Sequence, residues 1–367
     1  MRLLGIFVAL VFMLASGRVE ASVADTTGKV PWIRKSSLIP IPIVYYTPET
    51  RFAGGLAALY TFRFRNQADD ERPSQLTLGF AYTQENQLLL YLPFQLFSKN
   101  QTWQFSGELG FYRYVYQFYG IGNDTRQQDK ETYDVDFPRI RMNALRLVAP
   151  HHYLGLRYWW DDYRITRTES GGLIDQDGVV GKNGGVISGT GLVWNYDSRN
   201  NLFYPTRGFW AEAEAYFNTQ VLGSDFNFSR YSIDAVAYFS KSEKRVWAVN
   251  AWLVHLRGEV PFQQLAFIGG PKKMRGYFEG RFRDKNLWIL QGEYRTWVKG
   301  PVGAAFFGGM GSVAPSPGAL FHRKIHFTFG LGLRFLLSKR DLINLRLDVA
   351  GNESGQVFPY LTVKEAF

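Results

Sequence analysis

Apolar and polar residues alternate strictly through one segment after another of this chain. In residues 325–337, IHFTFGLGLRFLL, every second residue is Ile, Phe or Leu, while His326 and Arg334 fall on the opposite face. Residues 208–218 alternate in the same way, with Glu214 opposite a row of Ala and Phe. A period of two is that of a β-strand with two different faces. Such long runs are typical of tilted strands that cross a bilayer.

Charged residues on only one face of each strand predict an all-β fold, a transmembrane antiparallel β-barrel with its apolar face in lipid and a wet interior. A soluble β-sandwich is the alternative. The composition favours the barrel, because the chain has 30 Phe, 21 Tyr, 10 Trp and 37 Gly but a mean hydropathy of −0.19. After residue 15 no apolar run approaches the about 20 residues that a membrane helix needs.

The N-terminus predicts export. Residues 1–21 have the pattern of a cleaved signal peptide: Arg2, an apolar run over 3–15, and small residues ending at Ala21. A membrane anchor is the alternative. Together with the barrel pattern, this predicts the cell outer membrane as the location. Residues 22–38 are then a short periplasmic segment and residues 39–367 are the barrel.

Sixteen strands are predicted, an even number, as in single-chain bacterial barrels. They cover 39–46, 52–64, 75–84, 87–98, 102–119, 132–148, 153–168, 185–197, 208–218, 228–239, 246–259, 287–298, 302–314, 325–337, 342–349 and 357–367. The first is short and holds Pro40 and Pro42, and the last closes on the aromatic Phe367. Because proline cannot donate to a sheet ladder, the closure between these two strands is predicted to be the weakest pairing.

Four motifs, in order, resemble those of the BamA/TamA superfamily of outer-membrane assembly and translocation barrels (the bacterial surface-antigen family). They are a first hairpin, YYTPET (45–50); a turn with Asp197, Arg199, Pro205 and Gly208; Arg275-Gly276-Tyr277 after Gly269-Gly270; and the last two strands, with LRLD (345–348) and KEAF (364–367). The resemblance covers the whole chain after the signal peptide.

The resemblance implies that the long loop 260–286 folds back into the lumen. Arg275 is then expected to make a charge-assisted hydrogen bond with Glu293, which faces inward. The family has a second carboxylate in its thirteenth strand, but this chain has Gly309 there, so looser anchoring is expected. A solvated surface loop that meets lipopolysaccharide phosphates is the alternative. Residues 22–38 are too few for a POTRA domain, which implies a short family member without one.

No enzymatic motif is found, so the protein is predicted not to be an enzyme, and no cofactor or metal site is expected. The chain has no cysteine and a net charge of +10. Export makes nucleic acid an unsuitable partner, and the expected partners are outer-membrane lipids, including lipopolysaccharide, and outer-membrane assembly or secretion proteins. The predicted function is a component of outer-membrane biogenesis that inserts or translocates protein or lipid. The alternatives are a passive or gated pore with a basic lumen and a purely structural or adhesive barrel.

Overall fold

The computed structural model describes residues 36–64, 67, 71, 73–242, 244–338 and 342–367. The signal peptide predicted at 1–21 lies outside the described residues, as does most of the segment 22–38. Among the described residues there is no helix of the length and hydrophobicity needed to span a membrane.

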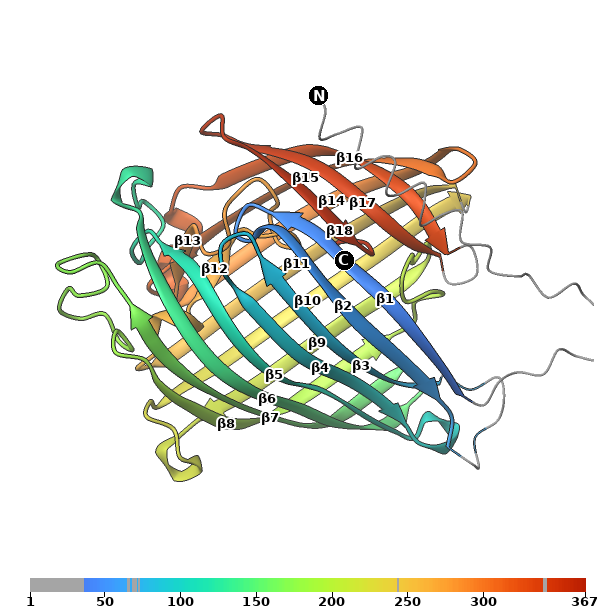
Figure 1. The fold of residues 1–367 in the computed structure, drawn as a ribbon, viewed down its shortest axis with the longest axis horizontal. Helices are drawn as coiled ribbons and strands as arrows, with labels where there is room; N and C mark the ends of the chain where they lie inside the picture. Colours follow the sequence, from blue (N-terminus) through green and yellow to red (C-terminus); the bar gives the residue numbers. More distant parts are fainter. Residues whose placement is uncertain (1–35, 65–66, 68–70, 72, 243, 339–341) are drawn as a thin grey trace, which may run out of the picture. The chain divides into compact units, whose positions relative to one another are not determined.

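Sixteen antiparallel strands form a closed barrel, which confirms the predicted fold class (Figure 1). They are β1 (Ser36–Thr47), β2 (Arg51–Phe62), β3 (Ser74–Thr83), β4 (Leu88–Phe97), β5 (Trp103–Phe118), β6 (Glu131–Ala149), β7 (His152–Arg167), β8 (Gly185–Asp197), β9 (Gly208–Asn218), β10 (Phe228–Ser242), β11 (Arg245–Gly258), β14 (Asn286–Lys299), β15 (Val302–Ala314), β16 (His326–Ser338), β17 (Ile343–Asn352) and β18 (Val357–Val363). Each strand pairs with its neighbours in chain order, and β11 pairs directly with β14.

Two strand predictions need correction. The first strand is not short, because β1 has 12 residues. The last strand was predicted to run to Phe367 but ends at Val363. Lys364 adopts a positive φ of 72°, which turns the chain out of the sheet. A backbone oxygen of Phe367 accepts a hydrogen bond from Arg295 at 2.8 Å, so residues 364–367 form a tail held by a polar contact.

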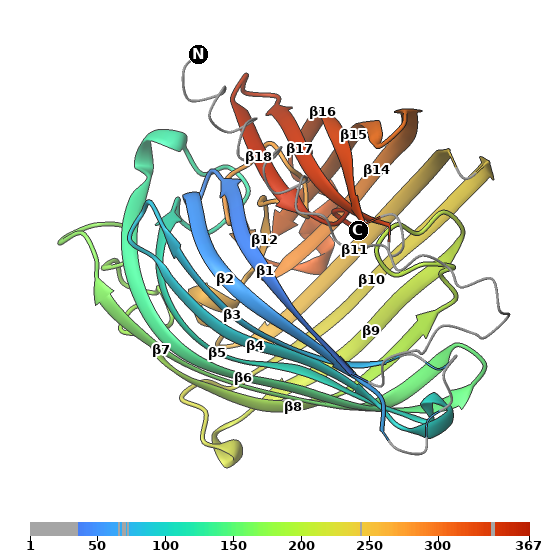
Figure 2. The same cartoon turned by 45° about the vertical axis from the view of Figure 1, so that its right-hand side comes forward.

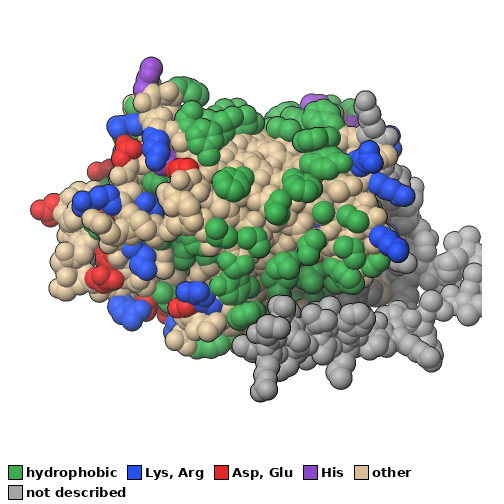
Figure 3. All heavy atoms as spheres, turned by 90° about the horizontal axis from the view of Figure 1, so that it is seen from above, with side chains coloured by type: hydrophobic (Ala, Val, Ile, Leu, Met, Phe, Trp, Pro, Cys, Tyr) green, Lys and Arg blue, Asp and Glu red, His purple; other side chains and the backbone are tan. Residues whose placement is uncertain are grey.

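The wall has the two faces that the alternation predicts. On β16, Phe327, Phe329 and Leu331 are exposed, whereas Thr328 and Arg334 are buried. Figure 3 shows apolar side chains gathered over the middle of the wall and charged side chains toward its two ends. This is the arrangement expected of a wall that faces hydrocarbon between two polar layers.

The two ends of the barrel differ. One end, here the long-loop end, carries the connections 119–130, 168–184, 219–227 and 315–325; the other, the short-turn end, carries turns such as 150–151 and 300–301. The lumen loop, residues 259–285, starts at the long-loop end and contains a small sheet of β12 (Ala266–Ile268) and β13 (Phe282–Asp284). Figures 1 and 2 show it inside the ring of strands.

Candidate functional site

Arg275 of the lumen loop is the centre of a buried charge network. Its guanidinium makes ion pairs with Glu293 on β14 and Asp348 on β17, and it lies 3.5 Å from the centre of the Phe307 ring on β15. All four side chains are buried. The pair with Glu293 is the contact expected from the sequence. Because β15 and β16 separate the two carboxylates, a single side chain ties the loop to two places on the wall.

Three further arginines and one further carboxylate complete the network: Arg295, Arg334, Arg346 and Glu365. Arg334 donates to Asp348 at 2.6 Å, to Glu293 at 3.0 Å and to Glu365 at 2.8 Å. Arg295 donates to Glu293 at 2.7 Å. Glu365 belongs to the tail, so the tail contributes a carboxylate to the network. Four arginines therefore face three side-chain carboxylates, and a backbone oxygen of Phe367 adds a further acceptor for Arg295.

Looser anchoring was expected because Gly309 lacks the carboxylate that the family has in this strand, but Asp348 supplies Arg275 with a second carboxylate. Alternation along β17 places Asp348 inward, but no signal in the sequence showed that it reaches the lumen loop. Gly309 has a different role. A Cβ there would lie 3.1 Å from the Cβ of Gln291 and 3.4 Å from the Cγ of Met274. The glycine therefore leaves room for the loop against β15.

The glycines of the motif allow the loop backbone to approach its neighbours. Gly276 has a φ of 112°, and a Cβ there would lie 2.7 Å from the carbonyl oxygen of Gly351 on β17. Gly269 has a φ of 115°. Gly270, with a φ of 94°, donates its N–H to the carbonyl oxygen of Tyr277 at 3.1 Å. These conformations are accessible to glycine and strained for other residues.

A second contact joins the lumen loop to the first hairpin. The backbone N–H of Glu279 donates to Oε1 of Glu49, in the β1–β2 turn, at 2.8 Å. Oε2 of Glu49 is buried and has no hydrogen-bond partner among the described residues. Burial raises the pKa of Glu49. Burial and then the neighbouring Glu49 raise the pKa of Glu279 to about 7. The two carboxyl groups therefore disfavour each other's charge.

The long-loop end has a polar clasp. Tyr277 donates its hydroxyl to Glu353 in the β17–β18 turn, and His326 contacts the same carboxylate at 2.8 Å. The other ring nitrogen of His326 lies 3.0 Å from the carbonyl oxygen of Asn123. Partial burial opposes ionisation of Glu353, but the hydrogen bonds from Tyr277 and His326 prevail and lower its pKa to about 2. The clasp joins the lumen loop to the loop after β5 and to the turn before β18.

The turn motif before β9 is ordered by its own side chains. Arg199 donates to both carboxylate oxygens of Asp197, at 2.9 and 3.0 Å. Gly208 has a φ of 108°, and a Cβ there would lie 2.3 Å from the carbonyl oxygen of Ser198. Pro205 is buried in the turn. The local contacts explain these residues as turn formers.

The seam between β1 and β18 is the least paired joint of the barrel. β1 and β2 are in register over 12 residue pairs, whereas β1 and β18 share the single pair Tyr46↔Leu361. β18 ends at Val363, which the antiparallel register places opposite Val44. The tail then turns inward, so residues 36–43 extend past β18. Within the described part of the chain, this stretch of β1 has no strand partner on the seam side.

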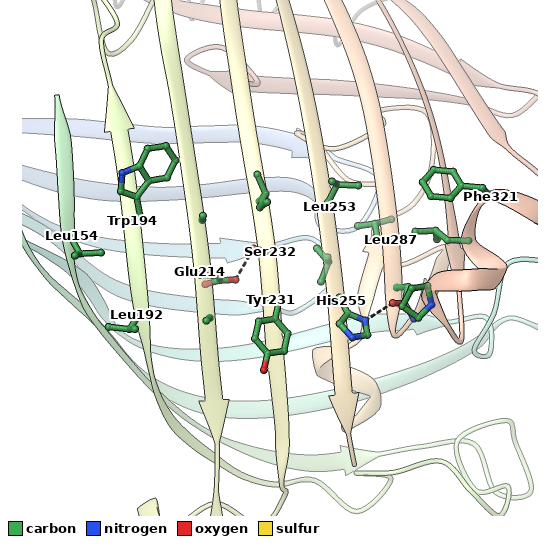
Figure 4. Close-up of a pocket in the computed structure, with 17 residues that line it drawn as sticks. Leu154, Leu192, Trp194, Glu214, Tyr231, Ser232, Leu253, His255, Leu287 and Phe321 are labelled. Atoms are coloured by element: carbon green, nitrogen blue, oxygen red, sulfur yellow. Dashed lines mark hydrogen bonds between the residues drawn. The ribbon is translucent and has the colours of Figure 1, made fainter.

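An apolar hollow of about 720 Å³ lies on the outer wall, from β7 across β11 and β14 to the segment 317–322 (Figure 4). Leu192, Ile233 and Leu253 line it and are exposed. Glu214 also borders it, but its carboxylate accepts from Ser232 at 2.9 Å and pairs with Arg157 in the lumen. Tyr231, His255 and Asn286 also belong to the lining, and the His255 ring lies 2.6 Å from Oδ1 of Asn286. The hollow is therefore mostly apolar. No cluster of three potential metal-binding side chains occurs in the described ranges.

Comparisons with known proteins agree with this geometry. The family model described as "Omp85 superfamily domain" matches residues 54–352. The structure resembles BamA from Haemophilus ducreyi, solved without POTRA domains 1–3, with a TM-score of 0.59, 16% identity, and coverage of 90% of this chain and 70% of that chain. It also resembles CdiB from Acinetobacter baumannii, with a TM-score of 0.60, 12% identity, and coverage of 90% of this chain and 60% of that one. For CdiB from Escherichia coli the TM-score is 0.58 at 10% identity, with coverage of 90% and 62%.

A sequence comparison with curated proteins finds no significant match. The chain spans less than two thirds of either CdiB chain. At these identities the solved structures establish the fold alone. The family model matches well over half of the sequence, from β2 to the end of β17. The chain therefore belongs to the Omp85 superfamily.

Proposed function

We propose that this barrel, in the cell outer membrane, inserts other proteins into that membrane by pairing an incoming strand with the open edge of β1. The observation that carries the proposal is the seam. Residues 36–43 pair with β2 on one side, but only Tyr46 is in register with β18. The role is non-enzymatic. Its partners are outer-membrane lipids, including lipopolysaccharide, and outer-membrane assembly or secretion proteins.

An open strand edge is costly in hydrocarbon, because unpaired backbone N–H and C=O groups find no water there. An added strand relieves that cost through main-chain hydrogen bonds, a mode of recognition that does not depend on sequence. The outward side chains Leu38 and Val44 are exposed beside this edge, so an apolar strand face would continue the lipid-facing surface of the wall.

Pro40 and Pro42 change which hydrogen-bonding groups this edge offers to another strand. They are two residues apart, so their missing N–H groups lie on the same side of β1. Prolines within sheets occur on the side without a ladder partner, which here is the seam side. The edge therefore offers mainly carbonyl acceptors. This lowers its tendency to pair with a second copy of itself, and it leaves acceptors for the N–H groups of another strand.

A disulfide lock tests the proposal, since the chain has no cysteine of its own. Tyr46→Cys with Leu361→Cys joins the pair at the seam, and Leu333→Cys with Leu347→Cys joins a matched pair inside the β16–β17 hairpin. The barrels are reconstituted in lipid vesicles, and the folding of a small urea-unfolded outer-membrane barrel is followed by gel mobility.

The native barrel and the oxidised hairpin pair should both accelerate folding. The oxidised seam pair should not, and reductant should restore it. A seam lock that remains as active as the native barrel would refute strand insertion at this joint. A native barrel that gives no acceleration over protein-free vesicles would refute the insertion role.

A gated pore with a basic lumen is the second candidate. The lumen loop favours gating over free passage, because it crosses the interior and is anchored to β14 and β17. Single-channel conductance of the native barrel and of a variant lacking residues 271–284 separates the two functions. A large conductance gained on deletion indicates that the loop occludes the lumen, and a native barrel with high steady conductance supports the pore.

A further inference from the structure

Arg346 joins the lumen loop to the last strand near the short-turn end of the barrel. Its Nη2 donates to the carbonyl oxygen of Pro271 at 2.9 Å, and its Nε donates to the hydroxyl of Thr362 on β18 at 2.8 Å. Lys272 follows Pro271, and Lys364 lies two residues after Thr362. The hydrogen bonds of Arg346 therefore gather three cationic residues from the loop, β17 and the tail.

The cations of this group lack sufficient counter-charge. Among the described residues, neither Lys272 nor Lys364 makes an ion pair. Arg346 is 2% exposed, yet its Nη1 has no hydrogen-bond partner in the described part of the chain. Its nearest carboxylate, Asp348 at 3.3 Å, is already shared with two other arginines. A buried guanidinium nitrogen without an acceptor is unfavourable, and an anion would satisfy it.

The electrostatics indicate that these cations act on one another. Enclosure by the barrel and then the charge of Arg346 lower the pKa of Lys272, against the opposite effect of Glu279. Enclosure and then the charge of Lys272 lower the pKa of Lys364. The aromatic ring of Phe203, from the turn before β9, lies 4.8 Å from Nζ of Lys364 and covers that side of the group. Lys273, by contrast, is neutralised by Asp234 at 2.6 Å.

We propose that Lys272, Arg346 and Lys364 form a binding site for a phosphate group inside the lumen, beside the seam. A tetrahedral phosphate accepts hydrogen bonds from several directions, which suits one guanidinium nitrogen and two flexible ammonium groups. Both lysine side chains are exposed to the lumen, so the ligand can reach them. The phosphate belongs to a lipid headgroup that enters the lumen beside the C-terminal end of β18, or it is free phosphate that enters from the solvent.

The site is independent of the proposed insertion role, because it requires the loop and tail to be docked, not the seam to open. Binding is measured by isothermal titration on the full barrel in uncharged detergent micelles. One arm uses inorganic phosphate and the other uses a soluble short-chain phosphatidylglycerol. Acetate serves as the carboxylate probe. Circular dichroism and gel mobility establish that each variant is folded.

Lys272→Gln and Lys364→Gln should each weaken phosphate binding about tenfold, the effect of losing one charge-assisted contact. The double variant should abolish it, while Lys273→Gln, the matched control in the same loop, should bind as the native barrel does. Binding of inorganic phosphate alone identifies a site for the free anion, and tighter binding of the lipid identifies a headgroup site. The proposal is overturned if the folded native barrel binds neither probe, if acetate binds as tightly as phosphate, or if Lys273→Gln weakens binding as much as Lys272→Gln.

Discussion

The buried network has more arginines than side-chain carboxylates, which predicts that losing a carboxylate destabilises the barrel more than losing an arginine. Four arginines share three carboxylates around Glu293, Asp348 and Glu365. Replacing Arg275 by Met leaves three arginines and three side-chain carboxylates. Replacing Glu293 by Gln leaves four arginines on two carboxylates. We therefore expect Glu293→Gln to destabilise the barrel more than Arg275→Met, although the two residues form one ion pair.

The magnitudes follow from what each change leaves behind. Uncompensated buried charge costs about 3–5 kcal/mol when one partner of a buried pair is removed, and Glu293→Gln approaches that range because Arg275, Arg295 and Arg334 all lose the same acceptor. Arg275→Met should cost only about 1–2 kcal/mol, because an apolar side chain of similar size leaves no bare charge. Met also keeps the contact with Phe307 and removes a buried Nε that has no partner among the described residues.

Two measurements test this order. Urea unfolding in micelles, followed by tryptophan fluorescence, gives the free energy of unfolding of each variant. Chymotrypsin cleavage after Tyr277 or Phe278 reports the open lumen loop, whose population should rise about 5–30-fold in Arg275→Met, corresponding to 1–2 kcal/mol. If Arg275→Met is as destabilising as Glu293→Gln, or more so, the argument from charge imbalance is wrong.

Three further predictions follow from the loop and the seam. Hydrogen exchange should be faster in residues 36–43 than in 326–338, and equal protection would contradict the open edge. Because the docked loop raises the pKa of Glu279 to about 7 from an ordinary value near 4.5, docking takes up a proton, so the loop should become harder to cleave as pH falls from 8 to 5. For a half-buried carboxyl, the gain in docking free energy at low pH is about 1–2 kcal/mol. Glu279→Gln should remove this pH dependence of cleavage, and a variant that keeps the pH dependence would exclude this carboxyl as its cause. Gly276→Ala should destabilise the barrel by about 1–3 kcal/mol, through a strained φ and a clash with β17. Urea unfolding measures this against the control Gly318→Ala, where an added Cβ would meet nothing within 4 Å. Equal destabilisation by the two variants would show that the loop backbone can shift to accept the Cβ.

The sequence predicts the wall well because lipid and water impose a period of two on every strand. The bounds 185–197, 208–218 and 302–314 agree with β8, β9 and β15, where one face is apolar and the other polar or small. The same rule fails at the C-terminus. Residues 357–367 have a pattern that can continue as a strand, but a positive φ at Lys364 and the hydrogen bond of Phe367 to Arg295 draw the tail inward.

Partners across the lumen are less predictable, since they depend on how the barrel closes. Glu293 follows the lumen loop closely, and its inward position on β14 suffices to pair it with Arg275. Asp348 and Glu365 also lie in motifs that resemble those of the family, but the residues around them in the sequence do not indicate that both carboxylates contact the same arginines. The pairing of Glu49 with Glu279 joins residues 230 positions apart, and no strand pattern encodes it.

The sequence separations between partners in the charge network also predict the order in which these contacts form during folding. The lumen loop emerges before its anchors: Asp348 lies 73 residues after Arg275, and Glu365 follows later still. Contacts of such separation form slowly and late. With β14 alone, Glu293 is the one carboxylate of the network that Arg275 and Arg295 can reach. Asp348 and Glu365 come from β17 and the tail, so the loop gains its full set of contacts only when the final strands have joined the barrel. Its docking thus marks the completion of the barrel, and a chain stalled before β17 would be left with a loose, cleavable interior that a protease could recognise.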